Sequence, residues 1–328
     1  MAVWDSAIRI FAGSSGDVFA RRVCDWLDAQ PGKAQVIQFT EGNLFVRVLE
    51  TVRDKDVYLV QPIALRPNEE FTEILFWMDA FKRASAGSVT AIIPYFGYAK
   101  GDKKDEPRVS IRGRVCAECI ELSGADRVVT MDLHSPQVQG FFKKPVDHLY
   151  AAPILAAYVR KHLDTDNLVV VAPDAGFAKE ARSFAGRLGL PTAICDKTRK
   201  GHDERARIME IIGDVGGRDC LIVDDFSISG GTLVEVARGL RDRGAKRITA
   251  CVSHMLLSEQ GLERIAASPI DRVISTDSVP NSAILGAPNV VIVSVAPLFA
   301  ETIRRIHMRE SVSPLFDDVP LEVLQGME

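Results

Sequence analysis

The stretch "CLIVDDFSISGGT", residues 220–232, joins a short apolar run to two adjacent carboxylates and then to hydroxyls and glycines. The segment after it, "LVEVARGLRDRGAK" (233–246), has the apolar spacing that is typical of an amphipathic helix. A buried strand that passes through a glycine-rich turn into a helix is the repeating unit of an α/β fold. We therefore expect a strand, a turn and a helix here, in that order.

The same alternation of strand and helix patterns recurs along the whole chain. Short apolar runs rich in β-branched residues lie at 8–13, 56–61, 89–96, 127–134, 167–174, 219–225, 247–254, 272–278 and 290–297. Between many of them lie amphipathic stretches, which predicts an α/β fold of mostly parallel sheets flanked by helices. A chain of 328 residues suggests two domains. We place them at 1–150 and 151–304, and expect a tail of about 305–328 to pack back on the first.

Composition narrows the class of protein. The chain has a formal net charge of −4, which argues against a nucleic-acid partner held by broad electrostatics. No basic segment precedes an apolar one near the start, and the longest apolar run is too short to span a bilayer. We expect a cytoplasmic protein without a membrane partner. Cys116 and Cys119 have redox spacing but lie in a stretch that predicts a helix, so two packed thiols are favoured over a metal or redox role.

The glycine-rich turn is suited to an anion, because amides at a helix N-terminus point outward. Hydroxyl donors and small residues line it: Ser227, Ser229, Gly230, Gly231 and Thr232. The carboxylates of Asp224 and Asp225 only accept hydrogen bonds at neutral pH, which suits sugar hydroxyls or a metal. A capped helix after a strand is the plainer alternative, but burying two carboxylates without partners is costly. The residues thus indicate a phosphorylated sugar.

Polar side chains also follow other expected strands. Asp132 and His134 come after the run at 127–131, and Asp174 comes after the run at 168–172. In open α/β sheets the ligand crevice lies at the carboxyl ends of the strands. These positions are therefore further candidates for chemistry.

The stretch at 220–232 resembles the loop that binds 5-phosphoribosyl 1-pyrophosphate (PRPP) in type I phosphoribosyltransferases and in ribose-phosphate diphosphokinases, the PRPP synthetases. Four further segments resemble the diphosphokinases and have no counterpart in the transferases. They are residues 91–153, residues 172–199, "TDSVP" at 276–280 and "AETIRRIHMRESVSPLF" at 300–316. The resemblance runs from Ile8 to Phe316 and implies two domains of the phosphoribosyltransferase-like fold.

The resemblance implies transfer of the β,γ-diphosphoryl group of Mg-ATP to the anomeric hydroxyl of ribose 5-phosphate. It implies Mg²⁺ near His134 and Asp174, with Asp224, Asp225 and the turn holding the ribose phosphate. Family members carry a lysine and an arginine on a mobile lid, which match Lys197 and Arg199 in the charged stretch 195–207. The plainer alternative for such a charge run is a solvated loop.

The implied nucleotide site departs from the family pattern. The matching residues are Phe39, Glu41, Asn43, Lys100, Asp102 and Arg108. Asn43 stands where the family has a second acid, and Lys100 with Gly101 stands where it has an arginine and a glutamine. A lysine keeps the charge but lacks the planar fork of an arginine. The contacts to adenine are therefore altered, and ATP remains the expected co-substrate.

The phosphate turn departs as well, since Ile228 and Ser229 stand where the family has an aspartate and a threonine. The departures at the nucleotide site and at the phosphate turn both concern substrate recognition. Two alternatives therefore remain beside the synthesis of PRPP from ribose 5-phosphate. One is a larger 5-substituted ribose, such as ADP-ribose, as the acceptor. The other is a non-catalytic regulatory partner of a true synthetase. The resemblance also implies a homo-oligomer built from dimers, with a hexamer as the family's usual form.

Overall fold

The computed structural model describes residues 7–199, 207–317 and 319–327, and for 197–199 and 207–209 it describes the backbone alone. The chain divides into two compact units. The first unit consists of residues 1–150, 277–280 and 294–328, and the second consists of residues 151–276 and 281–293. The C-terminal segment of the first unit thus begins at Ser294, earlier than the expected start near 305.

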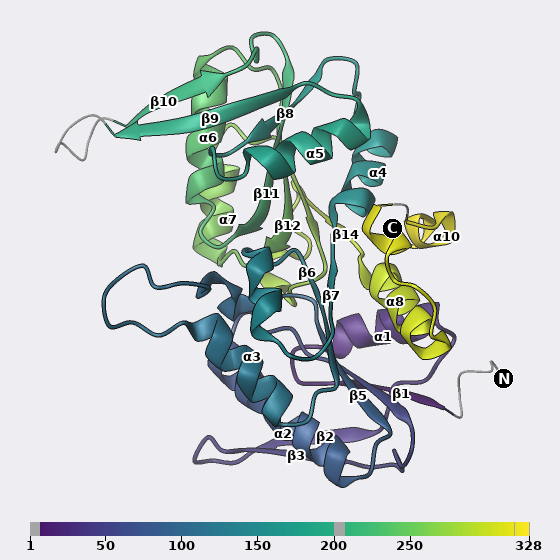
Figure 1. The fold of residues 1–328 in the computed structure, drawn as a ribbon. Helices are drawn as coiled ribbons and strands as arrows, with labels where there is room; N and C mark the ends of the chain where they lie inside the picture. Colours follow the sequence, from purple (N-terminus) through teal and green to yellow (C-terminus); the bar gives the residue numbers. More distant parts are fainter. Residues whose placement is uncertain (1–6, 200–206, 318, 328) are drawn as a thin grey trace. The chain divides into compact units, whose positions relative to one another are not determined.

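In the first unit, parallel strands form one sheet in the order β1-β4-β5-β6-β7, and β2 pairs with β3 as a separate antiparallel hairpin (Figure 1). The strands are β1 (Ile8–Ala12), β2 (Ala34–Gln38), β3 (Leu44–Val48), β4 (Asp56–Val60), β5 (Ser88–Ile93), β6 (Arg127–Met131) and β7 (Val146–Leu149). The helices are α1 (Asp17–Trp26), α2 (Pro67–Arg83), η1 (Gly97–Lys100), α3 (Arg112–Leu122), η2 (Pro136–Phe141), α8 (Ala296–Met308), α9 (Pro314–Asp317) and α10 (Leu321–Gln325).

Helices cover both faces of this sheet. On one face, Trp77 and Phe81 of α2 stack at a centroid distance of 5.4 Å, and both are fully buried against the strands together with α3. On the other face, α1 packs against α8, with the rings of Phe19 and Phe299 edge to face at 5.3 Å. Strands buried on both faces explain the continuous apolar runs of the sequence.

The second unit contains a larger sheet in the order β10-β9-β8-β11-β12-β13-β14, in which every pair except β10 with β9 is parallel. Its strands are β8 (Leu168–Ala172), β9 (Thr192–Arg199), β10 (Arg207–Ile212), β11 (Asp219–Ser227), β12 (Ile248–Met255), β13 (Arg272–Thr276) and β14 (Val290–Val293). Its helices are α4 (Ala152–His162), α5 (Ala178–Leu188), α6 (Gly231–Asp242), α7 (Glu259–Ala266) and η3 (Ser282–Ile284).

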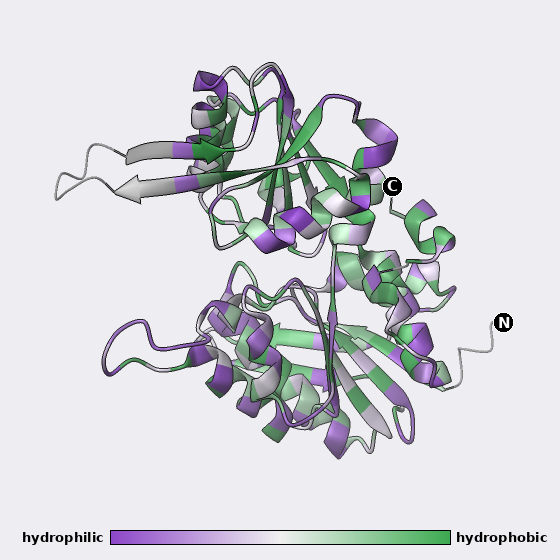
Figure 2. Cartoon of the chain, turned by 45° about the horizontal axis from the view of Figure 1, so that its top comes forward, coloured by the Kyte–Doolittle hydropathy of each residue, from purple (hydrophilic) through white to green (hydrophobic). Residues whose placement is uncertain are grey.

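Apolar residues concentrate on the strands of each unit, and hydrophilic residues lie on the outward faces of the helices (Figure 2). In the second unit, Leu233, Val236 and Leu240 of α6 are fully buried and pack onto Ile222 of β11. The expected α/β fold of mostly parallel sheets flanked by helices is confirmed. The β2–β3 hairpin was not expected from the sequence, because its strands are only half-buried and lack a continuous apolar run.

Asp277 explains why the chain returns to the first unit at 277–280 and 294. Its carboxylate accepts hydrogen bonds from Ser294 Oγ at 2.6 Å and from the amide of Val295 at 2.8 Å, and it forms an ion pair with Arg22 of α1 at 2.6 Å. These contacts attach the start of α8 to the first unit. None of the helices in the described part of the chain combines the length and apolar character that a membrane span requires.

Candidate functional site

The carboxylates of Asp224 and Asp225 lie within β11, which extends farther than one of its neighbours. Pairing with β12 continues to Ser227 and Met255, whereas pairing with β8 ends at Ile222 and Val171. The sequence placed these carboxylates at the end of the strand; the structure continues the strand through Ser227 because β12 supplies pairing partners as far as that residue. The acidic pair is thereby left beyond the end of β8.

Asp174 lies next to this pair. β8 and β11 are adjacent and parallel, and Asp174 follows the end of β8 closely enough for its charge to act on Asp224. Burial first, and then the charges of Asp225 and Asp174, raise the pKa of Asp224 to about 8. A hydrogen bond from the amide of Asp225 to Asp224 Oδ1, at 3.0 Å, opposes that shift. The structure thus brings three sequence-predicted carboxylates together.

The turn after β11 has the geometry of an anion site. Gly230 has φ +71°, a conformation that side chains disfavour, and it precedes the first residue of α6. A methyl group at Gly230 would also lie 3.1 Å from Ile265 Cγ1. Ser229 and Thr232 are exposed, Ser227 is buried, and the amides of the first turn of α6 point out of the helix. The side chain of Ile228 is 51% exposed.

The two predicted catalytic cations lie on a hairpin. The backbone of β9 continues through Arg199 and pairs with β10, with Lys197 opposite Met209 and Arg199 opposite Arg207. The expectation of a loop after the strand is therefore wrong for these two residues, because β10 provides a partner strand. Their side chains, and residues 200–206 of the charged stretch, lie outside the described residues.

In the first unit, His134 follows a tightly held turn at the end of β6. The amide of Asp132 donates to the carbonyl of Leu149 at 3.0 Å, and the amide of Leu133 donates to Nε2 of the buried His148 at 2.9 Å. Asp132 adopts φ +40°, a strained conformation for an aspartate. The turn presents His134 as an exposed side chain at the carboxyl end of the sheet.

Phe39, Glu41 and Asn43 lie on the turn of the β2–β3 hairpin. The amide of Phe39 donates to the carbonyl of Asn43 at 2.8 Å, and Gly42 takes φ +88°. Phe39 is 44% exposed, and its ring lies 6.3 Å from the ring of Phe45, which is 43% exposed. Two accessible aromatic rings beside polar residues form a surface on which a planar base can stack.

Lys100 ends the 3-10 helix η1, and Asp102 follows two residues later in the connection from β5 to α3. Gly101 is required by packing, because a methyl group there would lie 2.8 Å from Arg112 Cβ. Arg108 is exposed and has φ +65°. The glycine that replaces the family's glutamine therefore reflects the close approach of α3 to η1.

Comparison with known proteins identifies the family of this chain. Residues 8–124 match the model of the N-terminal domain of ribose phosphate pyrophosphokinase, and residues 201–317 match the phosphoribosyl synthetase-associated domain. A ribose-phosphate pyrophosphokinase of Brucella melitensis is 43% identical over 94% of this chain and 100% of its own length. One from Chromobacterium violaceum is 44% identical, with 97% of each chain covered. The chain belongs to the ribose-phosphate pyrophosphokinase family.

A solved structure agrees with this assignment. The phosphoribosylpyrophosphate synthetase of Mycobacterium smegmatis superposes with a TM-score of 0.87 at 35% identity, over 93% of this chain and 100% of that one. The resemblance noted from the sequence is thus confirmed for the family and the fold.

Three residues near the expected pyrophosphokinase sites were missed by sequence reasoning. Arg264 of α7 donates from Nη1 to the carbonyl of Ser229 at 3.1 Å, beside the phosphate turn. His148 supports the turn before His134, and Phe45 lies beside Phe39. Tertiary packing or the β2–β3 hairpin brings each of these three residues to its site. No sequence motif around them indicates that position.

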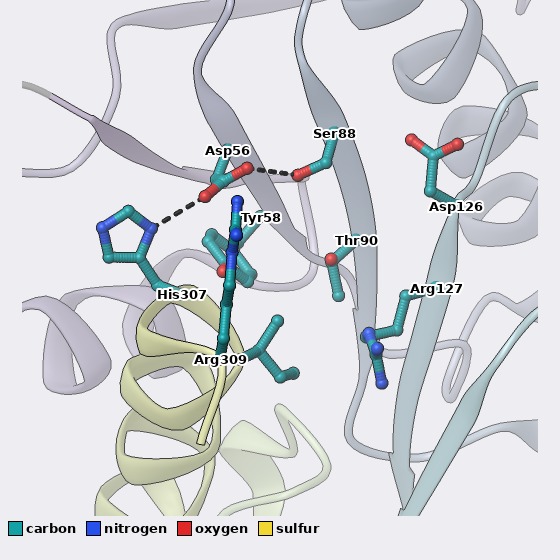
Figure 3. Close-up of a pocket in the computed structure, with 9 residues that line it drawn as sticks. Asp56, Tyr58, Ser88, Thr90, Asp126, Arg127, His307 and Arg309 are labelled. Atoms are coloured by element: carbon teal, nitrogen blue, oxygen red, sulfur yellow. Dashed lines mark hydrogen bonds and ion pairs between the residues drawn. The ribbon is translucent and has the colours of Figure 1, made fainter. Parts of the chain in front are cut away.

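A cavity of about 270 Å³ lies elsewhere in the first unit, at the amino ends of β4, β5 and β6 beside the end of α8 (Figure 3). Its lining residues are Asp56, Tyr58, Ser88, Thr90, Asp126, Arg127, Ile306, His307 and Arg309. His307 Nδ1 lies 2.7 Å from Asp56 Oδ2, and Ser88 donates to Asp56 Oδ1 at 2.6 Å. None of the predicted site residues lines this cavity, so it is distinct from the predicted nucleotide and acceptor sites.

Cys116 and Cys119 both lie on α3, and burial raises the pKa of the Cys116 thiol to about 12, which favours the packed-thiol interpretation. Within residues 7–199, 207–317 and 319–327, no cluster of three or more His, Cys, Asp or Glu side chains has the geometry of a metal site. Mg²⁺ usually needs only one or two protein carboxylates when substrate phosphates supply other ligands.

Proposed function

We propose that this protein transfers the β,γ-diphosphoryl group of ATP to the anomeric hydroxyl of ribose 5-phosphate, giving PRPP and AMP. The acceptor oxygen forms a bond to the β-phosphorus, the bond from that phosphorus to the α,β-bridging oxygen breaks, and the hydroxyl proton is released. The observation that carries the proposal is the acidic pair on β11 followed by the turn at Gly230, in a chain whose relatives are named ribose-phosphate pyrophosphokinases.

The acceptor is assigned to the second unit. Asp225 would accept hydrogen bonds from the ribose hydroxyls, as would Asp224 once a bound cation displaces the proton that it otherwise holds up to a pH of about 8. The hydroxyls of Ser227, Ser229 and Thr232 would donate to the 5-phosphate. Gly230 and Gly231 would allow this phosphate to approach the backbone, because neither carries a side chain. Charge-assisted hydrogen bonds of this kind are about twice as strong as neutral ones.

A divalent cation fits the carboxylate end of this site. Burial, and then the charges of Asp225 and Asp174, raise the pKa of Asp224, so a bound cation would relieve the repulsion among these carboxylates. Asp174 would hold Mg²⁺ in the second unit, and His134 is the candidate in the first. When bound, Mg²⁺ would neutralise charge on the ATP phosphates.

ATP is assigned to the first unit. The rings of Phe39 and Phe45 would stack on adenine, and Glu41 with Asn43 would accept from or donate to its polar edge. Lys100 and Arg108 would pair with phosphates, while Asp102 would orient a polar group of the nucleotide. Lys197 and Arg199 would stabilise the charge that develops on the transferred group and on the bridging oxygen.

The decisive experiment measures AMP and PRPP formed by the full chain from Mg-ATP and ribose 5-phosphate. The same assay with ADP-ribose compares kcat/KM for the two acceptors at equal protein concentration. We expect ribose 5-phosphate to be preferred at least about tenfold, which corresponds to about 1.4 kcal/mol in the transition state. A tenfold preference for ADP-ribose would instead establish the larger acceptor.

Absence of AMP with every acceptor would favour the regulatory-partner alternative. The comparisons do not favour either alternative, since the matched relatives are named for the synthesis itself. A homo-oligomer built from dimers remains part of the proposal, and its mass in solution can be measured by light scattering.

A further inference from the structure

The guanidinium of Arg264 lies against the phosphate turn. Its Nη1 donates to the carbonyl of Ser229 at 3.1 Å, and a methyl group at Gly231 would lie 3.7 Å from the same nitrogen. Ser229 precedes the left-handed Gly230, and Gly231 is the first residue of α6. The guanidinium of Arg264 therefore lies within contact distance of the residues before and after Gly230.

The backbone of α7 holds Arg264 in this place. The next residue, Ile265, is almost fully buried and lies against Gly230, so the helix packs directly on the turn. The side chain of Ser258 accepts the amide of Gly261 at 3.3 Å and caps the start of α7. Asn281 donates to the carbonyl of Leu257 at 2.8 Å, which fixes the segment that leads into the helix.

The phosphate turn has no cation of its own. Between Asp219 and Ala237, which covers β11, the turn and the first half of α6, the sequence contains neither lysine nor arginine. Ile228 adds an exposed apolar side chain at the same place. Arg264 thus supplies a positive charge that the turn lacks.

The guanidinium is available for a ligand. Arg264 is exposed, and among the described residues it has no carboxylate partner, its one hydrogen bond being the bond to Ser229. Arginine has five N–H donors in a planar fork, which matches the oxygens of a phosphate. By contrast, Arg247 at the other end of β11 is paired with Asp219 at 2.5 Å.

We propose that Arg264 binds the 5-phosphate of the acceptor and makes the site selective for a terminal phosphate. The inference rests on the proposed function, because the acceptor is assigned to this turn. A terminal phosphate carries close to two negative charges at neutral pH, whereas each phosphate inside a pyrophosphate diester carries one. A fixed cation beside the turn therefore favours ribose 5-phosphate over ADP-ribose.

The test compares Arg264→Ala, Arg264→Gln and Arg264→Lys with the unchanged full chain. Charge-assisted hydrogen bonds contribute enough that KM for ribose 5-phosphate should rise at least about tenfold in the Ala and Gln variants. The Lys variant keeps the charge and should recover most of the affinity. In all variants, kcat and KM for ATP should stay within about twofold, because the interaction is with the acceptor in both ground and transition states.

Arg238→Ala is the matched control. Arg238 is an exposed arginine on α6, seven residues beyond Gly231 and so roughly 10 Å along the helix, and it has no ion pair among the described residues. It should leave both KM values unchanged. Unchanged thermal unfolding midpoints would show that each variant is folded.

Two outcomes would overturn the inference. If Arg264→Ala binds ribose 5-phosphate as the unchanged chain does, Arg264 makes no contact with the phosphate. If Arg264→Gln recovers the affinity, the side chain only supports the carbonyl of Ser229. Calorimetric titration with ribose 5-phosphate reads binding without turnover, so this test stands even if the unchanged chain forms no AMP and the proposed reaction fails.

Discussion

Asp224→Asn should stabilise the ligand-free protein above pH 7 while weakening its hold on the acceptor. Asp224 lies half-buried in β11 with Asp225 beside it and Asp174 at the end of the neighbouring strand. Burial, then the charges of these neighbours, raise its pKa from 3.8 to about 8. Asparagine has nearly the same shape and carries no charge, so the variant removes the repulsion and keeps the packing.

The sign of the pH dependence follows from proton binding. The folded chain holds the Asp224 proton up to a pH of about 8, whereas the unfolded chain loses it near 3.8, so folding stability falls as pH rises through this window. At about 1.4 kcal/mol for each unit of pKa, the shift sets an upper limit of about 6 kcal/mol. Water reaches this half-buried group and its neighbours adjust, so we expect about 2 kcal/mol at pH 8.5 and almost none at pH 4.5.

The assay is denaturant unfolding at pH 4.5 and pH 8.5, with a chelator present so that no divalent cation binds the carboxylates. Asp219→Asn on the same strand is the matched control with the opposite sign. Hydrogen bonds from Arg247 lower the pKa of Asp219, so that variant should be destabilised at pH 8.5 and less so in acid. Activity assays of Asp224→Asn should show a raised KM for the acceptor.

An equal effect of Asp224→Asn at both pH values would refute the reasoning, since the stabilisation would then not come from removal of a charge. Destabilisation at pH 8.5 would refute it more directly. It would mean that the ionised carboxylate has a stabilising partner in the folded chain.

Further predictions concern other residues. Lys197→Ala should lower kcat about 100-fold at saturating substrates, as loss of one donor to a developing charge does, and unchanged turnover would remove Lys197 from the mechanism. His148→Leu leaves the buried amide of Leu133 without an acceptor, which should cost about 1–3 kcal/mol of folding stability. His148→Gln restores an acceptor near the position of Nε2 and should be more stable than His148→Leu. Equal stabilities of the two variants would exclude His148 as the acceptor for this amide. Burial raises the pKa of Cys24, Cys116, Cys220 and Cys251 to about 12, so iodoacetamide at pH 8 should leave them unlabelled in the native chain, and rapid labelling would contradict their burial.

The sequence by itself determined the α/β fold and the family. Strands buried on both faces must be continuously apolar, and helices that cover a sheet must be amphipathic. Both kinds of element can therefore be recognised from the local pattern of residues. The functional groups at 220–232 could also be predicted from the sequence, because a carboxylate pair, a glycine with positive φ and the start of a helix lie within a few positions of one another.

Only the tertiary structure decided which distant side chains join these local motifs. Asp174 comes near Asp224 because β8 and β11 are adjacent and parallel, and the order of strands in a sheet cannot be read from either strand alone. Arg264 reaches the phosphate turn because α7 packs on Gly230, and β9 continues through Arg199 because β10 pairs with it. The physical reason is that hydrogen-bond pairing between strands and packing between helices depend on partners far along the chain, which no local pattern of residues specifies.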